Sequence, residues 1–221
     1  MDDESGSGGG DGVEGGDGAD GTEGRVTLYV AVSLDGYVAS PDGGVSWLEA
    51  FEPSTDGEGP GRFEAFLVGV DCLVMGSRTY EQVLSFGEWP YGDRPTVVVT
   101  SRALPRATDA VELVDPEEGD GDAGIVGLAA DLRRRHGHVW LVGGARLARS
   151  FLRVDAVDEL RLTVVPLLLG DGVPLFGGER GVDGGGREDD REDGHGAHAL
   201  SLRGATPEPN GLVELRYEVE D

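Results

Sequence analysis

Apolar segments of strand length alternate with segments of helical periodicity through the middle of the chain, and this alternation restricts the fold more than any other feature. The segments that predict strands, from their apolar and β-branched residues, are 25–32, 71–75, 95–100, 111–114, 138–142 and 159–165. The segments that predict helices, from apolar residues spaced three and four apart, are 62–70, 77–84, 125–132 and 146–153. Ser77 is the expected N-cap of the second of these helices. A chain that alternates in this way is expected to form a mostly parallel sheet with helices on its faces.

The last part of the chain contains strand-like segments without helical segments between them, which predicts antiparallel strands at the C-terminal end of the sheet. In residues 212–219 one side of the strand carries Val213, Leu215, Tyr217 and Val219, and the other carries Glu214, Arg216 and Glu218. The expected architecture is therefore α/β with three layers, in which a mixed and mostly parallel sheet lies between helices.

Two segments fall outside this pattern. Residues 1–24 and 178–198 are rich in Gly, Asp and Glu and have almost no apolar residues to bury. They are predicted to be a disordered acidic tail and a disordered acidic insertion. A single domain then spans residues 25–221.

The acidity of the chain excludes several classes of function. Asp and Glu number 43 against 18 basic residues, all of them Arg, and the net charge is −25. Such a chain is not expected to bind nucleic acid, because Lys and Arg supply most of that affinity. No apolar run approaches the ~18 residues of a membrane span, and the N-terminus lacks the features of a secretory signal.

Composition also predicts the compartment. The single cysteine, Cys72, fits a reducing cytosol. Acidity in the absence of Lys is typical of a salt-rich cytoplasm, in which self-repulsion is screened. We therefore expect a cytoplasmic protein in a high-salt cytosol, the alternative being an acidic segment that binds a partner.

Three predicted strands end in turns rich in Gly or hydroxyl groups, at residues 75–79, 99–102 and 142–146. Ligands of parallel sheets bind at this edge, where free N–H groups of helix N-termini attract anions. Two such helices would suit a pyrophosphate, although each glycine could simply form a turn. Arg78 and Arg102 would suit a 2′-phosphate, or each could pair with a surface carboxylate.

Four segments together resemble the dihydrofolate reductase superfamily. They are VSLDGYVASPDG (32–43), MGSRTYEQV (75–83), VVVTSR (97–102) and the segment 139–176, which contains LVGGARLARSFL. Within that superfamily the chain is most similar to the C-terminal reductase domain of the bifunctional riboflavin-biosynthesis deaminase-reductase. The resemblance covers residues 25–221 apart from the insertion.

The resemblance implies a dihydrofolate reductase-like fold and an NADPH-dependent reductase. It implies that the cofactor is held by Gly76, Ser77, Arg78, Thr79, Thr100, Ser101, Arg102, Val142, Gly143, Gly144, Ala145 and Arg146. It also implies a cis peptide bond between Gly143 and Gly144, a homodimer, and a small-molecule substrate such as that of 5-amino-6-(5-phosphoribosylamino)uracil reductase.

Three departures from the family pattern bear on the cofactor and the substrate. The first leaves the preference for NADPH over NADH open, and the other two leave the substrate open. Arg78 lies one place later than the family's arginine, Val142 replaces an acid, and residues 88–95 lack the family's arginine-containing segment. The alternatives are a reductase of dihydrofolate or another pteridine, and a protein that binds NADP(H) without catalysis.

Candidates for the remaining chemistry are few. Asp35 is a candidate catalytic carboxylate, and Glu64 is a second one from its place on the first predicted helix. Ser33, Asp35 and Trp47 are candidate substrate contacts, although Asp35 could form a turn and Trp47 could be ordinary packing. The histidines occur in two pairs without further ligands at zinc spacing, so no metal site is expected.

Overall fold

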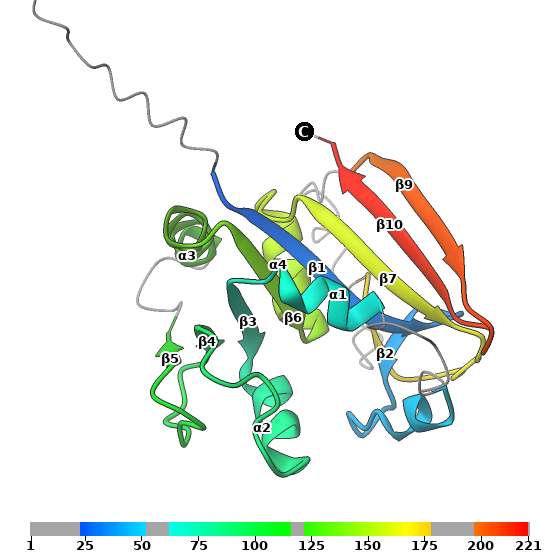
Figure 1. The fold of residues 1–221 in the computed structure, drawn as a ribbon, viewed down its shortest axis with the longest axis horizontal. Coiled ribbons are helices and arrows are strands. Elements are labelled where there is room, and N and C mark those ends of the chain that lie inside the picture. Colours follow the sequence, from blue (N-terminus) through cyan, green and yellow to red (C-terminus); the bar gives the residue numbers. More distant parts are fainter. Residues whose placement is uncertain (1–22, 52–61, 116–121, 178–196, 221) are drawn as a thin grey trace, which may run out of the picture.

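A mixed sheet of eight strands forms the middle layer of the computed structural model, which describes residues 23–51, 62–115, 122–177 and 197–220 (Figure 1). The order across the sheet is β5-β4-β3-β6-β1-β7-β10-β9. The strands are β1 (Arg25–Ser33), β3 (Cys72–Gly76), β4 (Thr96–Val99), β5 (Val111–Val114), β6 (His138–Gly143), β7 (Glu159–Val165), β9 (Leu200–Pro207) and β10 (Val213–Val219). In this order β5, β4, β3, β6, β1 and β7 run parallel to one another. Strand β10 is antiparallel to β7, and β9 is antiparallel to β10.

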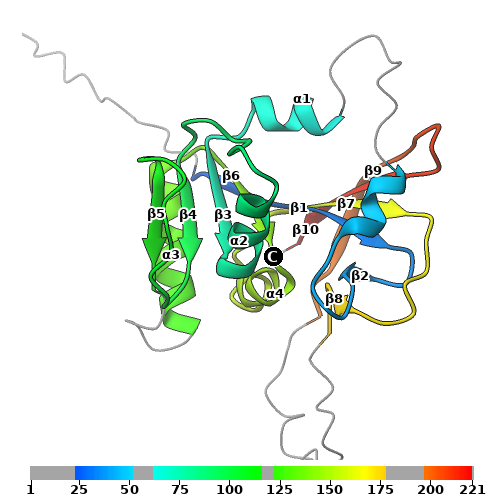
Figure 2. The same ribbon diagram turned by 90° about the horizontal axis from the view of Figure 1, so that it is seen from below.

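Helices cover both faces of the sheet, as Figure 2 shows for α1 and α4. The helices are α1 (Arg62–Val68), α2 (Ser77–Ser85), α3 (Asp122–Arg135) and α4 (Ala145–Arg153). On one face α3 and α4 pack on a core that includes Leu28, Leu141 and Phe151. On the other, Phe66 of α1 and Tyr80 of α2 pack with Met75 and Trp140. The predicted three-layer dihydrofolate reductase-like architecture is confirmed.

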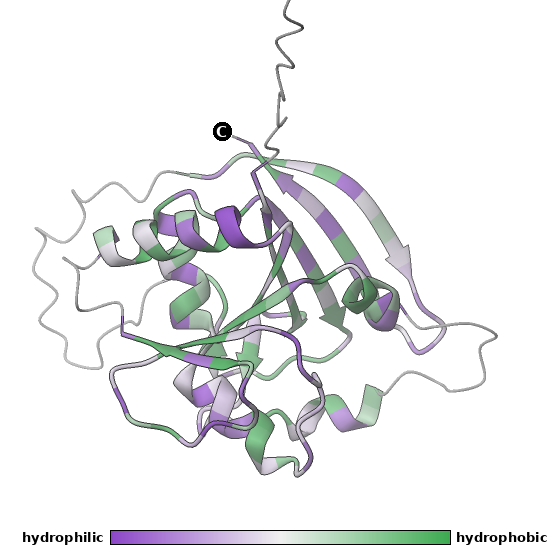
Figure 3. Ribbon diagram, turned by 60° about the vertical axis from the view of Figure 1, so that its left-hand side comes forward, coloured by the Kyte–Doolittle hydropathy of each residue, from purple (hydrophilic) through white to green (hydrophobic). Residues whose placement is uncertain are grey.

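The hydropathy pattern explains why the sheet keeps this register. In the strands under the helices both faces are apolar, whereas β9 and β10 show alternating bands (Figure 3). In β1, Val26 and Leu28 face α4 while Tyr29 faces α1. A slip by one residue would exchange these two sets of side chains, so burial on both faces fixes the pairing.

Short elements outside the sheet were not predicted. They are β2 (Tyr37–Ala39), which pairs with β8 (Val173–Pro174), and the 3-10 helix η1 (Ser46–Phe51). Strand β9 was also missed, because its residues do not alternate and it follows the acidic insertion. Each of these elements is too short, or too irregular in the spacing of its apolar residues, to give a periodic signal.

Two boundary predictions need correction. Ser77 does not cap α2, because Gly76 occupies the N-cap position and no side chain bonds to the first turn. Gly24, which the prediction assigned to the tail, is buried, and its N–H donates to the carbonyl of Arg133. Most of the predicted tail and insertion, residues 1–22 and 178–196, lies outside the described residues. None of the described helices is long and apolar enough to cross a membrane.

Candidate cofactor and substrate site

Two helix N-termini meet at the carboxyl edge of the sheet. Strands β3 and β6 are neighbours, and each runs directly into a helix, α2 and α4. A Cβ built on Gly76 would lie 3.8 Å from the Gly144 nitrogen, and one built on Gly144 would lie 3.2 Å from Thr79 Oγ1. Both N-caps are glycines without a side-chain cap, so the first-turn N–H groups of both helices are free for a ligand.

The geometry brings the predicted phosphate-binding residues together. Because β4, β3 and β6 are adjacent and parallel, the three turns that follow them share one edge of the sheet. The peptide bond between Gly143 and Gly144 is cis, as predicted. Val142 is half-buried in the core on the α1 face, and Ala145 is buried at the start of α4.

Arg78 and Arg146 are the second residues of α2 and α4, and both are exposed. Most arginines in the described part of the chain are ion-paired, yet the guanidinium groups of these two have no ion-pair or hydrogen-bond partner among the described residues. The helix dipole repels a cation at an N-terminus. Two unpaired arginines at two adjacent N-termini therefore create a site for an anion.

Arg102 has a carboxylate partner that the sequence did not reveal. Its guanidinium donates to Glu81 of α2 at 2.6 and 3.1 Å, and its backbone N–H donates to Thr100 Oγ1 at 3.0 Å. The Glu81 carboxylate raises the pKa of Arg102. The alternative of pairing with a surface carboxylate is thus present for Arg102, and Ser101 is exposed beside it.

Hydrogen bonds to Asp35 hold the turn after β1 against the loop after β7. Asp35 Oδ1 accepts hydrogen bonds from Ser33 Oγ at 2.6 Å and from the Leu169 N–H at 3.1 Å, and Oδ2 accepts from the Gly170 N–H at 2.7 Å. The bond from Ser33 is the main cause that lowers the pKa of Asp35. A carboxylate with three donors holds no proton at neutral pH, so the geometry favours an anchoring role over proton transfer.

Replacing Asp35 by asparagine is expected to loosen the loop after β7. The amide has a single acceptor oxygen, so at least one of the three donors loses its partner. We expect the Leu169 and Gly170 amides to exchange with deuterium about tenfold faster, with little change in the amides of β1. Unchanged exchange at both loop amides would contradict the anchoring role.

The side-chain polar atoms of the other two predicted site residues, Glu64 and Trp47, have no hydrogen-bond or ion-pair partner among the described residues. Glu64 is exposed on α1, and its carboxylate has no polar contact with the described residues. Trp47 lies in η1, and its Nε1 is buried without a hydrogen-bond partner among the described residues. The roles of Glu64 in catalysis and of Trp47 in substrate binding stay predictions.

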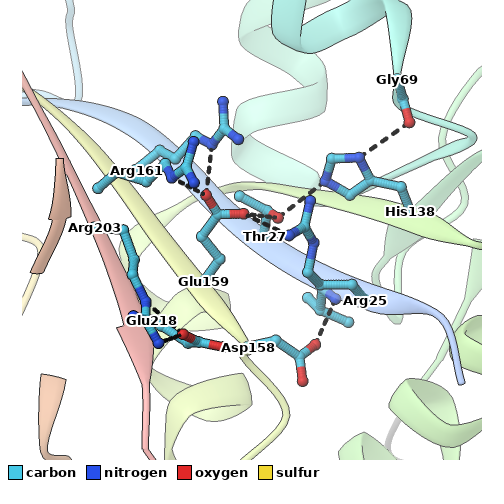
Figure 4. Close-up of polar contacts among 11 residues, drawn as sticks. Arg25, Thr27, Gly69, His138, Asp158, Glu159, Arg161, Arg203 and Glu218 are labelled. Carbon is cyan, nitrogen blue, oxygen red and sulfur yellow. Dashed lines mark hydrogen bonds and ion pairs between the residues drawn. The ribbon is translucent and has the colours of Figure 1, made fainter. Parts of the chain in front are cut away.

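A separate ionic cluster ties the amino ends of β1 and β7 together (Figure 4). Glu159 is 5% exposed and contacts Arg161 at 2.9 Å, Arg216 at 3.2 Å and Arg25 at 3.3 Å. Thr27 lies between Glu159 and His138. This cluster is at the opposite strand ends from the glycine turns, so it fixes the strands and takes no part in the site. The described residues contain no group of three His, Cys, Asp or Glu that could hold a metal ion.

Comparison with known proteins places these features in a family context. Residues 25–183 match the family model described as the RibD C-terminal domain. The chain is 36% identical over 154 residues to the uncharacterized protein YwjB of Bacillus subtilis (strain 168), which covers 69% of this chain and 82% of YwjB.

Solved structures have the same fold. A Shewanella sp. PV-4 protein described as a riboflavin biosynthesis protein superposes with a TM-score of 0.70 at 28% identity, over 89% of this chain and 99% of that one. A Thermotoga maritima diaminohydroxyphosphoribosylaminopyrimidine deaminase/5-amino-6-(5-phosphoribosylamino)uracil reductase superposes with a TM-score of 0.57 over 90% of this chain and 57% of that one. At 15% identity the second likeness concerns the fold alone.

Proposed function

The chain belongs to the RibD C-terminal domain family, and from that premise we propose that it is an NADPH-dependent reductase of the riboflavin-biosynthesis type. Its substrate on this proposal is an aminopyrimidine that carries a phosphoribosyl group. Dihydrofolate or another pteridine is the alternative acceptor.

The observation that carries the proposal is the pair of glycine-capped helix N-termini with Arg78 and Arg146 beside them. Free N–H groups and unpaired guanidinium groups are the donors that a pyrophosphate needs, and the glycines allow it to approach the backbone. These residues therefore fit a dinucleotide. Thr100 and Arg102 follow the neighbouring strand β4, where they would meet a 2′-phosphate.

When bound, reduced nicotinamide supplies the hydride. The chain has to bind the acceptor next to it, exclude water and direct a proton to the reduced atom. The arrangement of Asp35 favours a second candidate function, in which the protein binds NADP(H) without turnover, because hydrogen bonds from Ser33 and from the loop after β7 occupy this carboxylate.

Parallel titrations with NADPH and NADH in molar KCl test the proposal, with nicotinamide fluorescence and melting temperature as readouts. High salt screens the self-repulsion of a chain with net charge −25. We expect both readouts to respond, and NADPH to bind at least about tenfold more tightly than NADH, because Arg102 pairs with the extra phosphate. Binding without oxidation by any pyrimidine or pteridine would favour the non-catalytic alternative, and the absence of binding would refute both.

A further inference from the structure

A buried carboxylate with one free oxygen lies on the α1 face of the sheet. Glu214 of β10 is 9% exposed, and its Oε2 accepts a hydrogen bond from the Tyr29 hydroxyl at 2.8 Å. Burial, and then this hydrogen bond, raise the pKa of Tyr29 far above its usual range, so the phenol stays protonated and donates. Glu214 Oε1 accepts no hydrogen bond from the described residues, and it is not one of their fully buried partnerless atoms, so solvent reaches it.

Glu214 also lacks a cation. It forms no ion pair with any residue in the described ranges, although two arginines occupy the same face. Arg161 and Arg216 both bind Glu159, at 2.9 and 3.2 Å. Glu214 is thus a mostly buried carboxylate that one hydroxyl holds, and its oxygen Oε1 stays accessible with acceptor capacity that the donors of a ligand could use.

Small side chains form the floor beside Glu214. Cross-strand pairing places Ala31 of β1 next to Thr163 of β7, and Thr163 next to Glu214 of β10. Both Ala31 and Thr163 are partly exposed, although their strands lie in the interior of the sheet. The described residues therefore leave part of the face above them uncovered. Phe63 of α1 stands at its border, 42% exposed, with its ring 5.9 Å from that of Tyr29.

The row of Ala31, Thr163 and Glu214 is level with the glycine turn of β6. Leu28 pairs with Leu141, Ala31 lies three residues further along β1, and Gly144 lies three residues further along the chain, directly after β6. The sheet order places β1 and β7 between β6 and β10. With neighbouring strands about 4.8 Å apart, Glu214 lies roughly 14 Å across the sheet from the glycine turn. That span is the floor on which an acceptor would lie beside a bound dinucleotide.

We propose that Glu214 binds the acceptor by accepting hydrogen bonds from its ring and amino N–H groups. The ligand class is a nitrogen heterocycle with adjacent N–H donors, such as an aminopyrimidine, because a carboxylate accepts two parallel N–H bonds. The acceptor role rests on the proposed reductase function, whereas recognition of the N–H edge can be measured without NADPH.

Binding of two matched probes tests the inference. They are 2,4-diaminopyrimidine, which presents a ring N–H beside an amino N–H when N1 is protonated, and 2,4-dimethylpyrimidine, which has the same shape without the amino donors. Ligand-observed NMR titration of the wild type, without NADPH, is expected to give at least about tenfold tighter binding of the diamino probe. Glu214→Gln, which keeps the volume and an acceptor for Tyr29, should lose that preference.

Glu218→Gln is the matched control, because Glu218 lies on the same strand and face and is ion-paired with Arg203. It should bind both probes as the wild type does. Equal binding of the two probes by the wild type, a preference that survives in Glu214→Gln, or an equal loss in Glu218→Gln would overturn the inference.

A second variant, Tyr29→Phe, tests the same inference if Glu214→Gln fails to fold. It leaves the carboxylate in place but removes the hydroxyl that orients it, so diaminopyrimidine binding should weaken about threefold to tenfold while dimethylpyrimidine binding stays constant. Unchanged diaminopyrimidine binding in this variant would count against the inference. NADPH fluorescence with the same variants should match the wild type, and a wild type that fails to bind NADPH would count against the proposed function alone.

Discussion

Replacing Gly76 by valine is expected to abolish NADPH binding while the fold survives. Gly76 has φ −78° and ψ 161°, an extended conformation that any residue adopts, so the substitution introduces no backbone strain. A Cβ at this position would make ordinary contacts, 3.8 Å from the Gly144 nitrogen and 3.9 Å from the Gly143 oxygen. The two further methyl groups of valine would fill the gap between the N-termini of α2 and α4.

Gly76→Ala separates closure of this gap from the mere presence of a side chain. Because one methyl group fits, we expect the alanine variant to bind NADPH within about fivefold of the wild type, and the valine variant at least about a hundredfold more weakly, having lost several backbone and guanidinium contacts together. Nicotinamide fluorescence measures the binding, and circular dichroism with a melting curve confirms the fold. Binding by a folded Gly76→Val variant within tenfold of the wild type would show that phosphate binds elsewhere.

The order of elements and the glycine turns could be predicted from the sequence, because both are local signals. Apolar runs of strand length gave β1, β3, β4 and β6 to within two residues at each end. Parallel strands share a carboxyl edge, so the turns at Gly76 and Gly144 had to lie together once those strands were neighbours. The prediction that Ser77 is the N-cap of α2 was wrong. A hydroxyl residue is the usual cap, whereas here Gly76 occupies the position and leaves the N–H groups free.

Contacts between distant segments could not be predicted. Alternation in β10 correctly separates Glu214 from Leu215, but it suggests that Glu214 faces solvent. Both faces of the sheet instead bury side chains, and the hydroxyl of Tyr29, 185 residues away, donates a hydrogen bond to the Glu214 carboxylate. Likewise nothing in the residues around Arg102 indicates that Glu81 of α2 binds it. Only the placement of α2 against β4 brings the two together.

The pair of Arg102 and Glu81 is expected to set the choice between NADPH and NADH. A 2′-phosphate would compete with Glu81 for the Arg102 guanidinium, and the Glu81 carboxylate would repel the phosphate. Arg102→Ala should weaken NADPH binding at least about tenfold and NADH binding less than twofold, because only NADPH has the phosphate that a guanidinium binds. Glu81→Gln should have the opposite sign, with NADPH binding about threefold to tenfold tighter and NADH unchanged.

Arg106→Ala provides the matched control for this pair, since Arg106 is exposed in the loop after β4 and its side chain has no partner among the described residues. Titrations should be run at 0.1 M and 2 M KCl. Arg102 and Glu81 are 52% and 43% exposed, so salt screens them, and both effects should shrink at the higher concentration. Equal losses of NADPH and NADH in Arg102→Ala, or the same loss in Arg106→Ala, would place the 2′-phosphate away from the turn after β4. Opposite shifts in the two variants would instead mean that Glu81 reduces NADPH affinity in the native protein, and that the phosphate gains its guanidinium only by displacing a carboxylate.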